Sequence, residues 1–188
     1  MAMINDIEAF LRYFEAVNRR AMRDVGVLPA AAAVWQPPAG EGEGGWTIGQ
    51  LVGHICASRL YFAHAYLNEG WVYDLWPDDM AVQAHWLPAL QRSAAMFRER
   101  LAGTPNAWLE RRVALIDTPD ASIAGWRALL MMVEHDIHHR SQIDTYAGLN
   151  GWPVAQIFDR TYEGLYACGF NSASFKILTP YPLSLIHI

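Results

Sequence analysis

The chain has 188 residues, 53% of them hydrophobic and 18% charged, which is typical of one folded domain and excludes a disordered protein. A formal net charge of -5 offers no basic surface for nucleic acid. Residues 1–20 do not have the pattern of a signal peptide, and no apolar run is long enough to span a membrane. Only two cysteines occur, which is typical of reduced thiols. We therefore expect a soluble cytoplasmic protein.

The first part of the chain predicts one helix followed by a loop. Apolar residues recur at helical spacing over residues 4–25, with Asn5 or Asp6 as the N-cap and Gly26 as the stop signal. Three prolines and the GEGEGG run of residues 40–45 predict a loop over residues 29–45.

The second helix is predicted to begin at Thr47 and to end by Gly70. Thr47-Ile48-Gly49-Gln50 has the form of a capping box, in which the Thr hydroxyl and the Gln amide each bind the other residue's backbone N–H. His54 stands in this helix among apolar neighbours. It is either an ordinary core histidine or a ligand that needs partners from elsewhere.

A third helix is predicted from Pro77-Asp78-Asp79 to Leu101, with a kink at Pro88 or a restart near Ala89. Residues 106–121 lack a long helical pattern and are interpreted as an extended crossover.

The fourth helix is predicted to start with Asp120 or Ser122 as its cap and to run to about Ala147. A shorter fifth helix follows over residues 153–168. We expect a single domain over residues 1–170 and an irregular tail over residues 171–188, part of which has the character of non-native sequence.

The fourth helix carries three histidines within five residues, His135, His138 and His139. His135 and His139 are four residues apart, so their imidazoles lie about 40° apart on one face and can bind one metal ion. His138 points about 100° away from His139. A third donor therefore has to come from another element.

These elements predict an all-α protein, an antiparallel four-helix bundle with one long crossover and a short extra C-terminal helix. In such a bundle His54 could meet His135 and His139 in the core. Three neutral imidazoles with an open fourth position are typical of a catalytic zinc site. A carboxylate-bridged iron site is disfavoured, because the sequence lacks inward glutamates and Glu-x-x-His pairs.

Two motifs resemble the DinB-like (DinB/YfiT) superfamily. Residues 47–55, TIGQLVGHI, are similar to its "T-x-x-E-L-x-x-H" helix start, and residues 135–142, HDIHHRSQ, to its "H-x-x-H-H-R-G-Q" signature. Gln50 replaces the usual Glu and Ser141 the usual Gly, and neither change removes a ligand. The resemblance extends from the first helix to about residue 168.

The resemblance implies that His54, His135 and His139 hold a divalent metal ion, with zinc or nickel expected, at one end of a bundle that is often a homodimer. It also implies a small-molecule substrate. Members of known activity are often transferases or isomerases that use a low-molecular-weight thiol.

Three further residues are candidates for contacts near the metal. Gln142, three residues after His139, is expected to orient a ligand or to contact the substrate. His138 either lies beside the ligands or on the surface, with substrate binding or proton transfer as the alternative. Arg140 either binds an anionic substrate or forms a surface ion pair. The aromatic residues expected either to wall a pocket or to fill the core are Tyr61, Trp71, Tyr73 and Trp76.

Three functions remain open at this point. The first is a thiol transferase in which the metal holds the thiol as a thiolate nucleophile. The second is a metal-dependent hydrolase that uses a metal-bound hydroxide, although no Glu is placed like the general base of H-E-x-x-H proteins. The third is a non-catalytic, stress-related metal or ligand binder.

Overall fold

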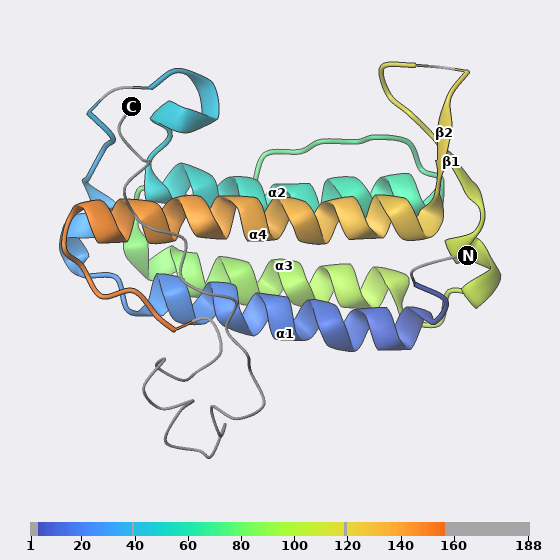
Figure 1. Cartoon of the computed structure of the whole chain (residues 1–188), viewed down its shortest axis with the longest axis horizontal. Coiled ribbons are helices and arrows are strands. Elements are labelled where there is room, and N and C mark those ends of the chain that lie inside the picture. Colours follow the sequence, from blue (N-terminus) through green and yellow to red (C-terminus); the bar gives the residue numbers. More distant parts are fainter. Residues whose placement is uncertain (1–3, 39, 119, 157–188) are drawn as a thin grey trace, which may run out of the picture. The chain divides into compact units, whose positions relative to one another are not determined.

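The computed structural model describes residues 4–38, 40–118 and 120–156, and four helices dominate this part of the chain (Figure 1). They are α1 (Ile7–Gly26), α2 (Ile48–Leu67), α3 (Trp86–Leu101) and α4 (Gly125–Leu149). The remaining regular structure comprises 3₁₀ turns, among them η2 (Gly42–Gly45), and the two strands β1 (Arg112–Ala114) and β2 (Ser122–Ala124). The predicted all-α four-helix bundle is confirmed.

Each helix packs against two others, and α1 lies across the bundle from α2, as α3 does from α4. α2 contacts α3 and α4, and α1 contacts the same two helices. The start of α2 at Gly49 meets the start of α3 at Trp86, so these two neighbours run parallel. Asp24 near the end of α1 likewise meets Arg140 of α4, which makes α1 and α4 parallel. The other two neighbouring pairs are antiparallel (Figure 1).

The long crossover is the segment of residues 68–85, which runs back alongside α2 and joins it to the parallel helix α3 (Figure 1). The expectation of an extended crossover at residues 106–121 was wrong. That segment contains a 3₁₀ turn, Asn106–Leu109, and most of a hairpin in which Val113 pairs with Ile123. The loose alternation of polar and apolar residues there is the pattern of a strand.

The third helix begins later than the Pro77-Asp78-Asp79 signal predicted. The Asp79 carboxylate accepts a hydrogen bond from the backbone N–H of Ala81, so this signal forms a turn. The helix starts at Trp86, which places Pro88 in its first turn. Since the first-turn N–H groups have no partner within the helix, Pro88 removes no hydrogen bond and neither a kink nor a restart is needed.

The fourth helix also begins later, at Gly125, and no side chain caps it. Asp120 and Ser122 are not its N-cap, because residues 122–124 are a strand and the N–H of Gly125 donates to the carbonyl of Arg111. Residues 153–156 have no regular structure. The rest of the predicted fifth helix, the predicted domain boundary at residue 170 and the tail lie outside the described residues.

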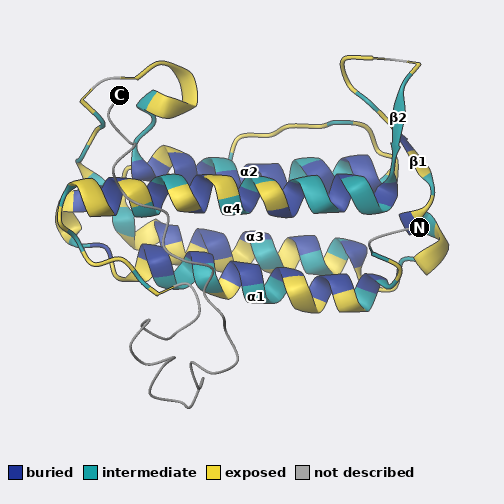
Figure 2. Cartoon of the chain, in the orientation of Figure 1, coloured by how far each residue is buried: buried dark blue, intermediate teal, exposed yellow. Residues whose placement is uncertain are grey.

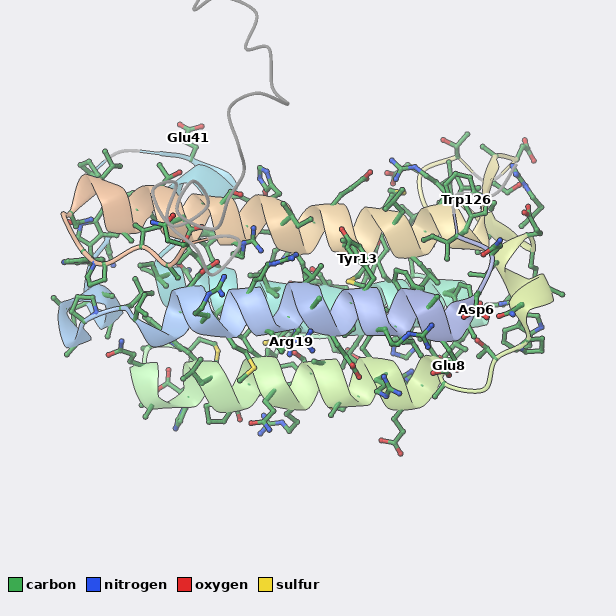
Figure 3. The ribbon with its side chains drawn as sticks, turned by 60° about the horizontal axis from the view of Figure 1, so that its bottom comes forward. Asp6, Glu8, Tyr13, Arg19, Glu41 and Trp126 are labelled. Carbon is green, nitrogen blue, oxygen red and sulfur yellow. The ribbon has the colours of Figure 1, made fainter. Side chains whose placement is uncertain are left out.

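Two of the three predicted N-caps are present, those of α1 and α2. The Asp6 carboxylate accepts from the N–H of Ala9 at the start of α1, where Figure 3 labels it. The Thr47 hydroxyl accepts from Gln50 N at 3.2 Å, and the side-chain oxygen Oε1 of Gln50 accepts from Thr47 N at 2.8 Å, which completes the capping box. α2 ends before Gly70, at Leu67, because Asn68 adopts the left-handed conformation with φ 66°.

The core is built from the inward faces of all four helices, whereas none of the crossover residues 68–85 is fully buried (Figure 2). Phe14 of α1 packs on Phe97 of α3 with ring centroids 4.6 Å apart in one half of the core. Trp86 anchors the other half, close to the start of α2. Within the described residues, none of the helices combines the length and hydropathy needed to cross a lipid bilayer.

The crossover lies so close to α2 that Gly49 leaves no room for a side chain. A Cβ atom there would overlap the carbonyl oxygen of Met80 and lie 2.9 Å from its carbonyl carbon, and both are backbone atoms that cannot rotate away. We expect Gly49→Ala to lower the free energy of unfolding by about 1–3 kcal/mol, as overpacking does. Urea titration followed by circular dichroism measures this.

Gly148→Ala is the matched control, since a Cβ at that helical position meets nothing within 4 Å. It should raise stability by about 0.5–1 kcal/mol, because alanine restricts the unfolded chain. Equal effects of the two substitutions would contradict the close approach at Gly49.

Candidate metal centre

The structure brings His54 of α2 together with His135 and His139 of α4. The Nε2 atoms of His54 and His135 are 2.8 Å apart, and one nitrogen from each of the three rings lies within 4.8 Å of the others. The ring of His139 has its centroid 4.4 Å from that of His135 and 4.8 Å from that of His54. The imidazoles of His135 and His139, which the i, i+4 spacing predicts on one face of α4, therefore meet the imidazole of His54 on α2.

Hydrogen bonds fix which ring nitrogens face that point. His54 Nδ1 lies 2.9 Å from the Tyr73 hydroxyl on the crossover, and His139 Nδ1 lies 3.2 Å from Gln142 Oε1. With the proton on Nδ1, the rings of His54 and His139 donate hydrogen bonds to these oxygens, and the lone pair of each Nε2 is free to bind an ion. His135 Nδ1 is buried and has no hydrogen-bond partner in the described part of the chain, so packing beside Phe62 holds this ring.

Burial keeps the three imidazoles neutral. Desolvation lowers the pKa of His54 to about 4 and that of His135 to about 3, and it also lowers the pKa of His139. Repulsion between imidazolium charges contributes to both of these lowered pKa values, whereas the Glu43 carboxylate acts to raise the pKa of His54. Neutral imidazole is the form that binds a divalent metal, so the donor set fits such an ion without a cost of deprotonation at neutral pH.

A second group of donors adjoins the first. Glu43, in η2, and the exposed His138 each place a ligand atom within 4.8 Å of one on His139. The Trp46 ring, just after η2, packs edge-on against His54, with centroids 4.9 Å apart, and stacks at 6.4 Å on His139. The 42–46 segment therefore covers one side of the three histidines.

A cavity of about 300 Å³ opens beside His54. Its walls are formed by α2, by Trp46 before it and by the crossover, and it is lined by Trp46, Gln50, Gly53, His54, Tyr73, Leu75, Trp76 and Met80. Of the four aromatic residues considered from the sequence, Tyr73 and Trp76 wall this cavity. Tyr61 and Trp71 instead contact each other, with centroids 4.9 Å apart, and pack on the core.

Gln142 and Arg140 lie on different sides of α4. Gln142 bonds His139, as described, whereas Arg140 is buried and its Nε lies 3.2 Å from Asp24 Oδ2 on α1. Desolvation raises the pKa of Asp24 to about 6; the Asp144 carboxylate adds to this shift, and Arg140 opposes it. Arg140 thus forms an ion pair, which is one of the two roles expected from the sequence. The pair lies inside the bundle, whereas a surface pair was expected.

The raised pKa of Asp24 has a measurable consequence. The folded chain binds this proton more tightly than the unfolded chain, so the stabilising effect is full below about pH 4 and disappears as the pH rises through 6. Between pH 4.5 and 6.5, the wild type should lose about 1–2 kcal/mol of stability relative to Asp24→Asn, which does not titrate. Urea unfolding of both metal-free proteins at several pH values tests this, and parallel profiles would contradict it.

The chain was compared with known proteins. The family model of the DinB superfamily matches residues 13–143. A search of curated proteins gives no match. Among solved structures, a DinB-like protein from Bacillus cereus ATCC 10987 is similar at 18% identity and a TM-score of 0.65, over 82% of this chain and 99% of that one.

Two Bacillus subtilis structures are also similar. One is a DinB-like protein with 16% identity and a TM-score of 0.59, over 79% of this chain and 98% of its own. The other is YfiT, described as a probable metal-dependent hydrolase with an unusual four-helix bundle topology, at 21% identity and a TM-score of 0.58, over 78% of this chain and 89% of its own. These structures establish the fold, and the family model spans α2, α3 and most of α4 with both histidine motifs. The chain therefore belongs to the DinB superfamily.

Proposed function

We propose that this chain is a divalent-metal-dependent enzyme whose ion, zinc or nickel, is held by His54, His135 and His139. The observation that carries the proposal is the convergence of three neutral imidazoles beside a cavity. A divalent ion with an exchangeable position lowers the pKa of a bound water or thiol and so supplies a nucleophile at neutral pH. A cavity of about 300 Å³ suits a small-molecule substrate.

The reaction we propose is transfer of a low-molecular-weight thiol to an electrophilic substrate. Apart from His54, the described side chains that line the cavity are apolar, aromatic or amide groups; the Glu43 carboxylate, 4.0 Å from His54 Nε2, is outside this lining. A thiolate attacks an electrophile without a further base, whereas attack by water usually depends on one. In this arrangement Tyr73 orients His54, and Trp46 and Trp76 provide apolar surface for the electrophile.

Metal-dependent hydrolysis is the second candidate. It rests on the same donor set and on the description of YfiT, whose 21% identity carries only the fold. Both candidates need the metal, and they differ in whether a thiol is consumed.

The two candidates are separated by one pair of assays on chain loaded with zinc or nickel. We expect glutathione, bacillithiol or mycothiol to be consumed with an activated aryl halide, and this turnover to disappear in His54→Ala. Hydrolysis of an activated ester without any thiol would favour the hydrolase. Absence of both activities in fully loaded protein would leave a metal-binding protein and overturn the proposal.

The homodimer implied by the resemblance is part of this proposal. Sedimentation equilibrium of the purified chain tests it, and a monomer at micromolar concentration would contradict it.

A further inference from the structure

The turn η2 is fastened to α4 by two side chains that lie on the histidine side of that helix. Gln142 Nε2 donates to the carbonyl oxygen of Glu43 at 2.6 Å, and the Tyr146 hydroxyl donates to that of Gly44 at 3.0 Å. Gln142 also contacts His139, so a single amide side chain links the turn to a candidate ligand. The backbone carbonyl groups of Glu43 and of the residue after it are thus bound to α4, close to the three histidines.

This arrangement directs the Glu43 carboxylate toward the point where the imidazoles converge. Its Oε1 lies 4.0 Å from His54 Nε2, and one of its oxygens lies within 4.8 Å of a ligand atom of His139. Two donors that each bind one zinc ion at about 2.0–2.2 Å lie at most about 4 Å apart. The side chain is 52% exposed and free to adjust, so the carboxylate can close the remaining distance by rotation.

We propose that Glu43 supplies a fourth protein ligand, a displaceable carboxylate, to the ion held by His54, His135 and His139. The inference rests on the metal site of the proposed function and adds a residue that neither histidine motif contains. When the carboxylate is bound, the position open to a thiol or to water is closed. A stronger ligand such as a thiolate takes this position by displacing an exposed side chain, which moves without disturbing the core.

The neighbouring residues argue for Glu43 rather than for another donor. His138 also lies close to His139, with ring centroids 4.9 Å apart, but it is not among the three histidines whose ligand atoms converge, whereas Glu43 lies 4.0 Å from His54 Nε2. Glu41, two residues before Glu43 in the same loop, is exposed and extends away from the helices (Figure 3). Glu41 therefore provides a control of matched chemistry and position, and His138→Ala tests whether Glu43 belongs to a separate second site.

The experiment measures zinc affinity by competition with a chromophoric chelator for the full chain and its variants. We expect Glu43→Gln to lower the affinity by about tenfold or more, because even an outer-shell partner is worth 10–100-fold. Glu41→Gln should remain within about twofold of the wild type. Thermal unfolding of the metal-free proteins verifies that each variant folds.

A second readout uses cobalt-substituted protein and 2-mercaptoethanol as the probe thiol. Because Glu43→Gln no longer competes for the fourth position, the thiol should produce its sulfur-to-cobalt absorption at about tenfold lower concentration than in the wild type. Glu41→Gln should match the wild type.

Three results would overturn the inference. Unchanged zinc affinity in Glu43→Gln, with binding still lost in His135→Ala, would remove the carboxylate ligand and leave the proposed function intact. A stoichiometry that falls from two ions to one in both Glu43→Gln and His138→Ala would assign Glu43 to a separate second site. A wild-type chain that binds no zinc, nickel or cobalt would overturn this inference and the proposed function together.

Discussion

Replacing His135 with alanine is expected to lower the affinity of the chain for zinc by more than about a hundredfold. Loss of an outer-shell partner already costs 10–100-fold, and His135 would be one of three imidazole ligands. Its Nε2 faces that of His54 at 2.8 Å, so the substitution removes one side of the donor set. Elemental analysis of protein purified without a histidine tag, followed by chelator competition, measures the change.

The metal-free His135→Ala variant should remain folded, since the ring is only partly buried and has no hydrogen bond to the rest of the core. His64→Ala is a suitable control, because His64 pairs with Glu69 near the end of α2 and has no place in the donor set. Wild-type metal content in His135→Ala would refute every metal-based function proposed for this chain.

Asp136→Asn is expected to cost about 3–5 kcal/mol of folding free energy, the largest effect on stability that we anticipate. Asp136 Oδ2 lies 2.9 Å from Arg59 Nη2 and also accepts from Arg59 Nε, and both side chains are almost inaccessible to solvent. The substitution therefore leaves the buried guanidinium of Arg59 without its counter-ion. Chemical denaturation of the metal-free protein measures the loss.

Two further variants distinguish an unpaired charge from a general weakening of α4. Glu134→Gln disrupts the exposed pair with Arg127 on the same helix and should cost less than about 1 kcal/mol. The double variant Arg59→Met/Asp136→Leu removes both charges and should recover most of the stability lost in Asp136→Asn. A double variant as unstable as Asp136→Asn would show that the loss does not come from the unpaired cation.

Local sequence signals predicted those parts of the fold that local physics determines. The capping box at Thr47 fixes the start of α2 through hydrogen bonds within four residues, and the i, i+4 spacing fixes the face shared by His135 and His139. The bundle follows from the amphipathic helices. These features depend on periodicity and capping, which a single sequence displays.

The parts that were missed depend on contacts distant in sequence. Asp78 and Asp79 resemble a helix start, and only the packing of Met80 against Gly49 shows that this segment is a crossover. Ser122 resembles a cap, yet it pairs with Ala114 in the hairpin.

Glu43 carries no signal in the sequence because it stands in a glycine-rich run, about 100 residues from the two side chains that hold its turn. The hydrogen bond between Tyr73 and His54 could not be predicted from the sequence either, because the crossover has no periodic pattern of apolar residues. In both cases the residue that forms the hydrogen bond lies on a distant element, and sequence patterns do not show which distant elements are neighbours.

The crossover has a further consequence for how the protein can be altered. The three candidate ligands stand on α2 and α4, whose faces also form the core, whereas half of the cavity wall (Tyr73, Leu75, Trp76 and Met80) belongs to the irregular segment of residues 68–85. Irregular surface segments tolerate changes in sequence and length that helices in a core do not. For the proposed enzyme, we therefore expect that exchanging this one stretch, with Tyr73 retained beside His54, alters the cavity and leaves the helices that carry the candidate ligands unchanged.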